Sequence, residues 1–456
     1  MAPSSTMPPG PPLPRLLQTA ALLLAGTRFL ETCQRRYGDL VTVSTVFDER
    51  LVMVFSPALL HEIFTAPGEQ LRAGEANVLL GPVLGQRSLL LLDGAEHLRQ
   101  RRLMLGPFHG ARMLAQLDTI RACADAEIDS WPVGEPFALL PRMRALTLAV
   151  ILRVVFGRSD AGPERGRLAA RLREMIEPLS RPGGVIALAA IIRGAGGRRS
   201  ARAFSARRRA VHELVAEEIA RRRADPHLQA RDDVFSALLL ARDEQGRGLS
   251  DEEVRDQLLT LLLAGHETTA TGLAWTFDLV LRDARVRERA AALDDRYLDA
   301  VVKEALRIRS VIPLIGRVVR ERPFALAGYE IPVGAELDPS IRTIHRRADL
   351  YPDPGRFLPE RFLGLDAPDT YTWTPFGGGT RRCLGASFAQ AEMRIVLGRV
   401  LARAALSLVD RRPARAQFRG IVLAPRGGVR VIARRAPLSP PSRATWRSPN
   451  KLLGDA

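Results

Sequence analysis

The sequence predicts a mostly α-helical protein with a minor β region. Long segments rich in Ala, Leu, Arg and Glu have helical periodicity and contain no interrupting proline. β-prone runs are few and short, and Gly, Pro or polar turn residues bound them. A chain of 456 residues, 46% of them hydrophobic, can bury one large core or two or three ordinary ones, so length alone does not decide the number of domains.

The predicted elements follow a simple order along the chain. A proline-rich segment, 1–14, precedes two β-prone runs around a polar turn, which predict an early hairpin. Helical segments then dominate until Gly and Pro separate several short strands. The stretch 436–456 has little apolar pattern and is expected to be disordered, which leaves 15–435 as the folded domain. We expect strands at 40–44, 51–55, 324–326, 329–331 and 336–338, and helices at 95–105, 143–156, 205–223 and 386–404.

The longest predicted helix covers 251–281. Ser250 is suited to cap its N-terminus, because a serine side chain accepts a hydrogen bond from a free backbone N–H of the first turn. The three acidic residues 251–253 lie near the positive end of the helix dipole. We expect this helix to cross the core.

The charge of the chain is strongly positive but evenly spread. The formal net charge is +17, and nearly all basic residues are arginines, with Lys303 and Lys451 the only lysines. These charges are intermixed with 50 acidic residues and form no basic stripe interleaved with aromatic side chains. The pattern therefore argues against a nucleic-acid partner.

The cysteine content indicates a reducing compartment. The three cysteines, Cys33, Cys123 and Cys383, are too few and too widely spaced for a disulfide framework or a zinc site. The apolar stretch 20–26 is too short to span a bilayer, and no signal-peptide cleavage pattern follows it. We therefore expect a cytoplasmic protein without a membrane anchor.

A glycine-rich bend precedes Cys383. Residues 376–385 have the sequence FGGGTRRCLG and lead into the predicted helix 386–404, so this cysteine lies near a helix N-terminus. Backbone N–H groups and the positive end of the dipole lower the pKa of a thiol there, and a thiolate is a soft metal ligand. The four glycines allow close backbone approach to a flat cofactor, and Arg381 supplies a cation for a carboxylate. An ordinary buried thiol remains the interpretation for Cys33 and Cys123.

The run 376–385 resembles the cysteine-ligand signature of the cytochrome P-450 superfamily. The two match at Phe376, Gly379, Arg381, Cys383 and Gly385. The resemblance implies that these residues bind haem b (iron protoporphyrin IX), with Cys383 as the thiolate ligand of the iron. It extends over about 11–434, and it implies a single large haem-binding domain with the cytochrome P-450 fold, as in soluble bacterial haem-thiolate monooxygenases.

The middle of the longest predicted helix has an unusual sequence. Residues 264–269, AGHETT, interrupt an apolar stretch, although an interior glycine costs about 1 kcal/mol relative to alanine. The run resembles the family's oxygen-binding groove, in which Ala264 and Gly265 leave room for O2 and Glu267 and Thr268 organise the water that delivers protons. Taken alone, the run is equally a polar patch on an amphipathic helix. His266 is expected to be structural.

A charged pair occupies another predicted helix. Glu304 and Arg307 are three residues apart and project to the same face. In the resembled family such a pair is buried behind the haem and joined by a later arginine, here Arg361. We therefore expect a structural role for these residues.

Three basic residues resemble contacts to the haem propionates. His97 and Arg101 are four apart in the predicted helix 95–105, and Arg317 follows later in the chain. As isolated features, a histidine and an arginine on an Arg-rich helix are simply solvated. The resemblance assigns all three to the cofactor.

The resemblance also implies a reaction and its partners. One oxygen atom of O2 is inserted into a C–H bond of a small apolar substrate, which the variable loops 73–91 and 178–209 would select. No flavin or iron–sulfur module is recognisable, so ferredoxin and ferredoxin reductase are the expected electron donors. Acidic ferredoxin is expected to dock on Arg99, Arg102 and Arg382.

Two alternatives stay open. The same haem site could use hydrogen peroxide directly, or rearrange a peroxide, without electron partners; the presence of Glu267 and Thr268 argues against this. The chain could also be a basic, non-catalytic binding protein that keeps the fold. The presence of every expected haem and oxygen residue argues against that alternative.

Overall fold

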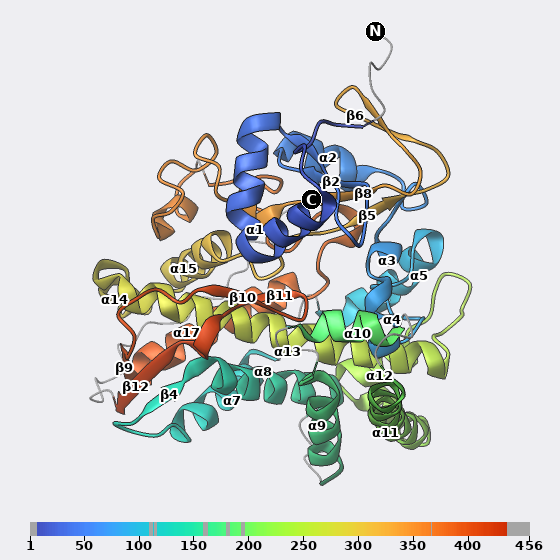
Figure 1. The fold of residues 1–456 in the computed structure, drawn as a ribbon. Coiled ribbons are helices and arrows are strands. Elements are labelled where there is room, and N and C mark those ends of the chain that lie inside the picture. Colours follow the sequence, from blue (N-terminus) through green and yellow to red (C-terminus); the bar gives the residue numbers. More distant parts are fainter. Residues whose placement is uncertain are drawn as a thin grey trace.

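A computed structural model describes residues 7–108, 113, 116–157, 163–178, 183–192, 197–365 and 367–435. Helices make up most of this part of the chain, and small sheets accompany them (Figure 1). The prediction of a mostly α fold with a minor β region is confirmed. The expected tail, 436–456, lies outside the described residues.

The helices pack around α13, which runs through the middle of the molecule (Figure 1). Helices α8, α15 and α17 all contact it. The longer described helices are α1 (Arg15–Tyr37), α2 (Pro57–Thr65), α5 (Gly94–Leu105), α7 (Leu117–Asp129), α8 (Leu139–Phe156), α9 (Pro163–Ile176), α10 (Gly184–Ile192), α11 (Arg198–Arg223), α12 (Val234–Leu240), α13 (Asp251–Arg282), α14 (Ala284–Ala290), α15 (Asp295–Ile308) and α17 (Ala386–Arg403). The short ones are α3 (Ala73–Ala76), α4 (Gly81–Leu84) and α16 (Ile341–Ile344).

The largest sheet in the described part has the strand order β1-β2-β8-β5-β3. Its strands β1 and β2 form the predicted antiparallel hairpin, and β8 then pairs in parallel with β2. A second sheet has the order β4-β12-β9, and β6–β7 and β10–β11 are separate hairpins. The strands are β1 (Leu40–Val43), β2 (Leu51–Val54), β3 (Leu71–Arg72), β4 (Pro136–Ala138), β5 (Arg317–Val319), β6 (Phe324–Leu326), β7 (Tyr329–Ile331), β8 (Glu336–Pro339), β9 (Ala404–Leu408), β10 (Ala416–Arg419), β11 (Val422–Pro425) and β12 (Arg430–Arg435).

The start of α13 confirms the predicted cap. The hydroxyl of Ser250 accepts from the N–H of Glu253, and the carboxylate of Glu253 accepts from the N–H of Ser250 at 2.7 Å. This reciprocal capping box satisfies free donors of the first helical turn. Most of α13 is buried, which confirms that it crosses the core.

Several segments are more regular than the sequence suggested. Helices α8 and α11 begin earlier than expected, and the segment 73–91 contains α3, α4 and the 3-10 turn η1 (Val78–Leu80). Helix α10 packs against η1, so the two segments expected to select the substrate lie together. Parts of the second segment, 179–182 and 193–196, lie outside the described residues.

The proline-rich segment packs onto the first strand. The carbonyls of Pro8 and Pro9 accept hydrogen bonds from the side chain and the backbone N–H of Thr42 at 2.7 and 2.9 Å. Among the helices of the described ranges, none is both long enough and apolar enough to cross a membrane.

Candidate active site

Cys383 lies in the loop that leads into α17. Its backbone N–H donates to the carbonyl of Phe376 at 2.9 Å, which closes the glycine-rich bend, and the N–H of Gly385 donates to the sulfur. The sulfur lies deep among protein atoms, yet the side chain is exposed. Its accessible face therefore opens on interior space rather than on the outer surface.

Burial opposes the effect of the helix terminus on the pKa of this thiol. It raises the pKa of Cys383, while the N–H of Gly385 and the guanidinium groups of Arg382 and Arg101 act in the opposite direction but do not prevail. The N–H of Gly385 thus lowers the pKa in the expected direction, but burial outweighs it when no metal ion is bound. Coordination by a metal ion would favour the thiolate and release the proton.

Two loop glycines are required for packing against α2. A Cβ at Gly378 would overlap the ring of Phe64, and a Cβ at Gly379 would overlap the backbone carbonyl of Phe64. Gly379 also has φ +61°, a conformation that strains other residues. No atom lies within 4 Å of a Cβ added at Gly385. At Gly378 and Gly379 the absent side chains make room for Phe64, a reason for glycine that the sequence did not reveal.

Four basic side chains from separate elements converge near this loop. His97 and Arg101 come from α5, Arg317 from β5 and Arg381 from the loop itself, and the three arginines all lie close enough to His97 to lower its pKa. Burial is the larger cause, and the combined effect brings the pKa of His97 to about 3. The imidazole is therefore neutral at physiological pH. Arg101 is also within electrostatic range of Cys383.

This basic cluster has more positive charge than the described residues neutralise. Arg381 is ion-paired with Asp93. Arg317 is buried, and among the described residues its guanidinium donates only to the preceding backbone carbonyl, at 2.8 Å. The side chain of Arg101 forms neither a hydrogen bond nor an ion pair with any described residue. Because buried charge without a partner is costly, the cluster is suited to bind an anion, and carboxylates such as haem propionates fit it.

The middle of α13 borders open space at one position. Ala264 is exposed although most of the helix is buried, and its carbonyl accepts a hydrogen bond from the hydroxyl of Thr268 at 2.6 Å. The position beside Gly265 is filled instead, since a Cβ there would lie 3.0 Å from Cδ1 of Ile151 on α8. Gly265 therefore permits close packing of α8 on α13. Of the two residues expected to leave room for O2, only Ala264 borders space.

Glu267 is held by a residue that the sequence did not reveal. Its carboxylate is ion-paired with Arg144 on α8. Burial raises the pKa of Glu267, and Arg144 followed by Arg419 lowers it. His266 is buried, and its Nδ1 lies 2.8 Å from the carbonyl of Leu262, which agrees with the structural role expected for it.

The predicted pair Glu304 and Arg307 is fully buried. Nε of Arg307 lies 2.7 Å from Oε2 of Glu304, and Nε of Arg361 lies 3.4 Å from Oε1 of the same carboxylate. Nη1 of Arg307 also donates to the carbonyl of His345 at 2.7 Å. In turn, the ring of His345 accepts from the N–H of Thr374 at 3.0 Å. The buried pair thus supports the beginning of the cysteine loop.

Four residues that support the site were not predictable from the sequence: Asp93, Arg144, His345 and Phe64. Each acts on a site residue from a distant part of the chain. No spacing in the sequence relates these positions to their partners. Only the proximity of α8 to α13, or of α2 to the cysteine loop, brings them into contact.

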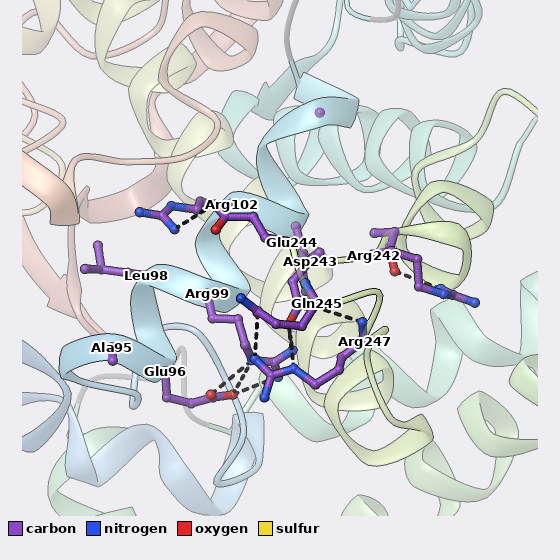
Figure 2. Close-up of a pocket in the computed structure, with 13 residues that line it drawn as sticks. Ala95, Glu96, Leu98, Arg99, Arg102, Arg242, Asp243, Glu244, Gln245 and Arg247 are labelled. Atoms are coloured by element: carbon purple, nitrogen blue, oxygen red, sulfur yellow. Dashed lines mark hydrogen bonds and ion pairs between the residues drawn. The ribbon is translucent and has the colours of Figure 1, made fainter.

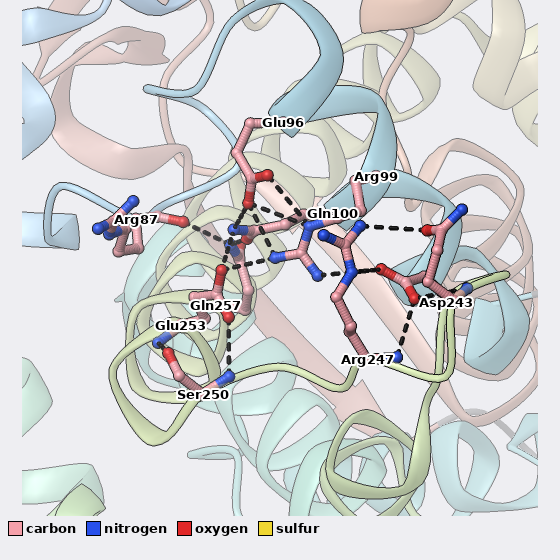
Figure 3. Close-up of polar contacts among 10 residues, drawn as sticks. Arg87, Glu96, Arg99, Gln100, Asp243, Arg247, Ser250, Glu253 and Gln257 are labelled. Atoms are coloured by element: carbon pink, nitrogen blue, oxygen red, sulfur yellow. Dashed lines mark hydrogen bonds and ion pairs between the residues drawn. The ribbon is translucent and has the colours of Figure 1, made fainter.

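The expected docking residue Arg99 is occupied by carboxylates of its own chain. It lies 2.8 Å from Glu96 and 2.7 Å from Glu253, with Asp243 at 3.8 Å, and only 18% of its side chain is exposed (Figure 3). Because Glu253 also completes the cap of α13, Arg99 ties α5 to the start of α13. The interpretation of Arg99 as a docking residue is therefore revised to a structural one.

Arg102, by contrast, is 70% exposed and lies 3.5 Å from the equally exposed Glu244. It helps to line a pocket of about 610 Å³ between α5 and the segment 241–247. The lining residues are drawn in Figure 2. Arg382 is also exposed. These two arginines remain accessible to a partner.

The donor set of the site fits haem. The sulfur of Cys383 would hold the iron, and His97, Arg101, Arg317 and Arg381 would face the propionates. Such a sulfur on the loop before α17, together with an alcohol and an acid in the middle of α13, defines the class of haem-thiolate proteins. A family model described as Cytochrome P450 matches residues 8–430. The chain belongs to the cytochrome P450 family.

Known relatives agree with this assignment. Putative cytochrome P450 135B1 of Mycobacterium tuberculosis is 42% identical over 448 residues, which cover 94% of this chain and 92% of the relative. Putative cytochrome P450 137 of the same species is 41% identical over 444 residues, covering 94% and 91%. The solved structure of retinoic acid-bound cyanobacterial CYP120A1 shares the fold, with a TM-score of 0.80 and 24% identity over 95% of this chain and 100% of that one.

The family establishes the coarse function and the cofactor. The chain is a haem-containing monooxygenase, and the predictions of its class, its fold and its haem b cofactor are confirmed.

Proposed function

We propose that this monooxygenase hydroxylates a C–H bond of a small apolar substrate with one atom of O2, using electrons from ferredoxin and ferredoxin reductase. The hydrogen bond from Thr268 to the carbonyl of Ala264, directly beside Glu267, supports the proposal most. This bond holds the hydroxyl of Thr268 beside Ala264, the exposed residue in the middle of α13. Monooxygenation needs protons at such a position, whereas a peroxide-driven reaction does not.

When haem is bound, its iron supplies the activation of O2. The chain's own residues provide the proton path. Because the proton of the Thr268 hydroxyl is donated to Ala264, the oxygen lone pairs of Thr268 are free to accept from water. Glu267 exchanges protons with such water, and its ion pair with Arg144 sets the position of the carboxylate.

The proposed substrate region is apolar. Helix α10 has the sequence GVIALAAII and lies against η1, whose residues are Val78, Leu79 and Leu80. Such surfaces favour binding by burial of apolar area, with few polar groups to orient the ligand. This composition supports a lipid-like or terpenoid substrate.

The proposed electron donor is an acidic ferredoxin. The exposed Arg102 and Arg382, on a chain with net charge +17, provide an electrostatic match for such a partner. We place the enzyme in the cytoplasm, where its cysteines, all free, remain reduced.

The first test concerns the thiolate. The wild type and Cys383→Ser are reduced with dithionite and exposed to carbon monoxide, and the Soret band is recorded. A strongly red-shifted band in the wild type that is lost in C383S is the expected result. An unshifted band in the wild type contradicts the proposal.

The second test concerns the proton path. Thr268→Val is compared with Thr269→Val, because both hydroxyls donate to the carbonyl four residues earlier, but Thr269 is buried. With a substrate found by its spectral shift in a panel of fatty acids and terpenoids, T268V is expected to lose about 10²-fold in product per O2 consumed and to release hydrogen peroxide. T269V should form as much product per O2 consumed as the wild type. Equal product formation by T268V and the wild type with hydrogen peroxide alone favours the peroxide-using alternative.

A further inference from the structure

The first half of α1 has the reverse of the usual polarity. Gln18 and Thr19 are buried, whereas the leucines around them are exposed, Leu16 by 69% and Leu24 by 88%. A surface helix normally turns its apolar stripe toward the core. Here the stripe faces outward. The exposed leucines are Leu13, Leu16, Leu17, Leu23 and Leu24.

Side-chain hydrogen bonds hold this reversed orientation. The carboxamide of Gln18 donates to the carbonyl of Leu13 at 2.8 Å and accepts from the N–H of Ser44 at 3.0 Å. The hydroxyl of Thr19 accepts from the N–H of Val46 at 3.0 Å. These contacts attach the turn between β1 and β2 to α1, on the side of the molecule where both lie in Figure 1. Rotation of the helix to bury its leucines would break the two hydrogen bonds with Ser44 and Val46.

The attached turn extends the apolar surface. Val46 and Phe47 are both more than half exposed. We call these two residues and the five exposed leucines the α1 patch. Exposed apolar side chains gathered on one helix and the turn bonded to it are typical of an interaction site.

A basic segment adjoins the α1 patch. The backbone of Ala25, with φ −126° and ψ 15°, interrupts α1 and separates its leucine-rich half from an arginine-rich half. The arginines Arg28, Arg35 and Arg36 are exposed, and none forms an ion pair with another described residue.

Most of the nearby acidic groups are ion-paired with arginines. Glu31 lies 2.9 Å from Arg346, and Asp39 lies 2.7 Å from Arg347. The turn has two acids: Glu49 is ion-paired with Arg15, and the carboxylate of Asp48 accepts a hydrogen bond from the backbone N–H of Arg50 at 2.8 Å. Around the α1 patch, Asp48 without an ion pair among the described residues is therefore outnumbered by Arg28, Arg35 and Arg36, so positive charge predominates, as it does in the chain as a whole.

We propose that the α1 patch inserts into the interface of an anionic lipid bilayer, with Arg28, Arg35 and Arg36 binding the lipid headgroups. An apolar helical face beside exposed arginines is the pattern of helices that lie in a membrane surface without spanning it. A second copy of this chain is a poorer occupant, because two surfaces of the same positive charge repel. The inference concerns the surface alone and is independent of the reaction proposed above.

The test is co-sedimentation of the full-length holoenzyme with vesicles. Phosphatidylcholine mixed with phosphatidylglycerol is compared with phosphatidylcholine alone. The triple variant Leu16→Ser, Leu17→Ser, Leu24→Ser is expected to partition at least about tenfold less than the wild type into the anionic vesicles. Leu365→Ser, which removes a fully exposed leucine elsewhere, is the control and should bind like the wild type.

A second variant tests the charges. Replacing Arg28, Arg35 and Arg36 by Gln should abolish the preference for anionic vesicles while the melting temperature stays unchanged. Wild type that sediments with neither kind of vesicle, or the leucine variant binding as well as the wild type, overturns the proposal. The proposal is also overturned if the wild type is a dimer in solution and the leucine variant is a monomer. The α1 patch would then be an interface between two copies of the chain.

Discussion

The carboxylate of Glu267 on α13 is ion-paired with the guanidinium of Arg144 on α8. Its neighbour Thr268 hydrogen-bonds to Ala264 instead. The acid and the alcohol proposed to deliver protons are therefore positioned by different partners. This separation predicts that the acid can be perturbed through α8 without displacing the alcohol.

Replacing Arg144 by Met should raise the pKa of Glu267 further, because burial already raises it and Arg144 is the main group that lowers it. An acid with a raised pKa binds its proton more tightly in the folded state. Its contribution to stability is therefore lost as pH rises from the unfolded pKa through the folded one. We expect R144M to lose more free energy of unfolding over this range than the wild type, and the acidic limb of its turnover profile to move to higher pH.

Urea unfolding and product formation measured across pH check this prediction. Arg142→Met is a matched control on the same helix, since Arg142 lies 3.6 Å from Glu127 and not at Glu267. Adding Glu267→Gln to R144M should remove the extra pH dependence. If it persists in the double variant, another group is responsible.

Glu304→Ala should lose haem and about 3 to 5 kcal/mol of unfolding free energy, because the charge of the fully buried Arg307 would be left uncompensated. Asp299→Ala on the same helix is the control. Its partner Lys303 lies 2.9 Å away in a part-exposed pair, so the loss should be below about 1 kcal/mol. Haem content and denaturant unfolding measure both effects. Full haem content in E304A contradicts the prediction.

Gly378→Ala should destabilise the cysteine loop by about 1 to 3 kcal/mol, since the added Cβ meets the ring of Phe64. Phe64→Leu should recover part of this loss in the double variant, which a double-mutant cycle measures. Gly385→Ala, whose Cβ meets no atom within 4 Å, should be nearly neutral. Equal losses in G378A and G385A would show that backbone freedom, and not Phe64, requires glycine at position 378.

Arg102→Glu and Arg382→Glu should slow reduction by ferredoxin and flatten its dependence on salt, because both arginines are exposed. Arg99→Ala should behave differently. It should lower the melting temperature, since it leaves Glu96 and Glu253 unpaired. Stopped-flow reduction and thermal unfolding separate the two effects. Normal reduction kinetics in the charge-reversal variants exclude this docking surface.

Local patterns in the sequence predicted the helices and the cap of α13 because these features depend on residues that are close together in the sequence. The box formed by Ser250 and Glu253 spans one helical turn, and the hairpin of β1 and β2 is closed by adjacent residues. The order of the strands β1-β2-β8-β5-β3 could not be predicted in this way, since β8 joins β2 from far along the chain. Long-range pairing leaves no periodic signal in either strand.

The sequence by itself determined which chemical groups the protein possesses. Cys383 with its glycine bend, and Glu267 beside Thr268, are contiguous runs, so their resemblance to a haem-thiolate family is visible without a fold. Only the tertiary structure decided how these groups behave. Burial raises the pKa of Cys383, Arg144 holds Glu267, and internal carboxylates occupy Arg99. Desolvation and charge pairing depend on residues that are distant in sequence and close in space, and no local pattern contains that information.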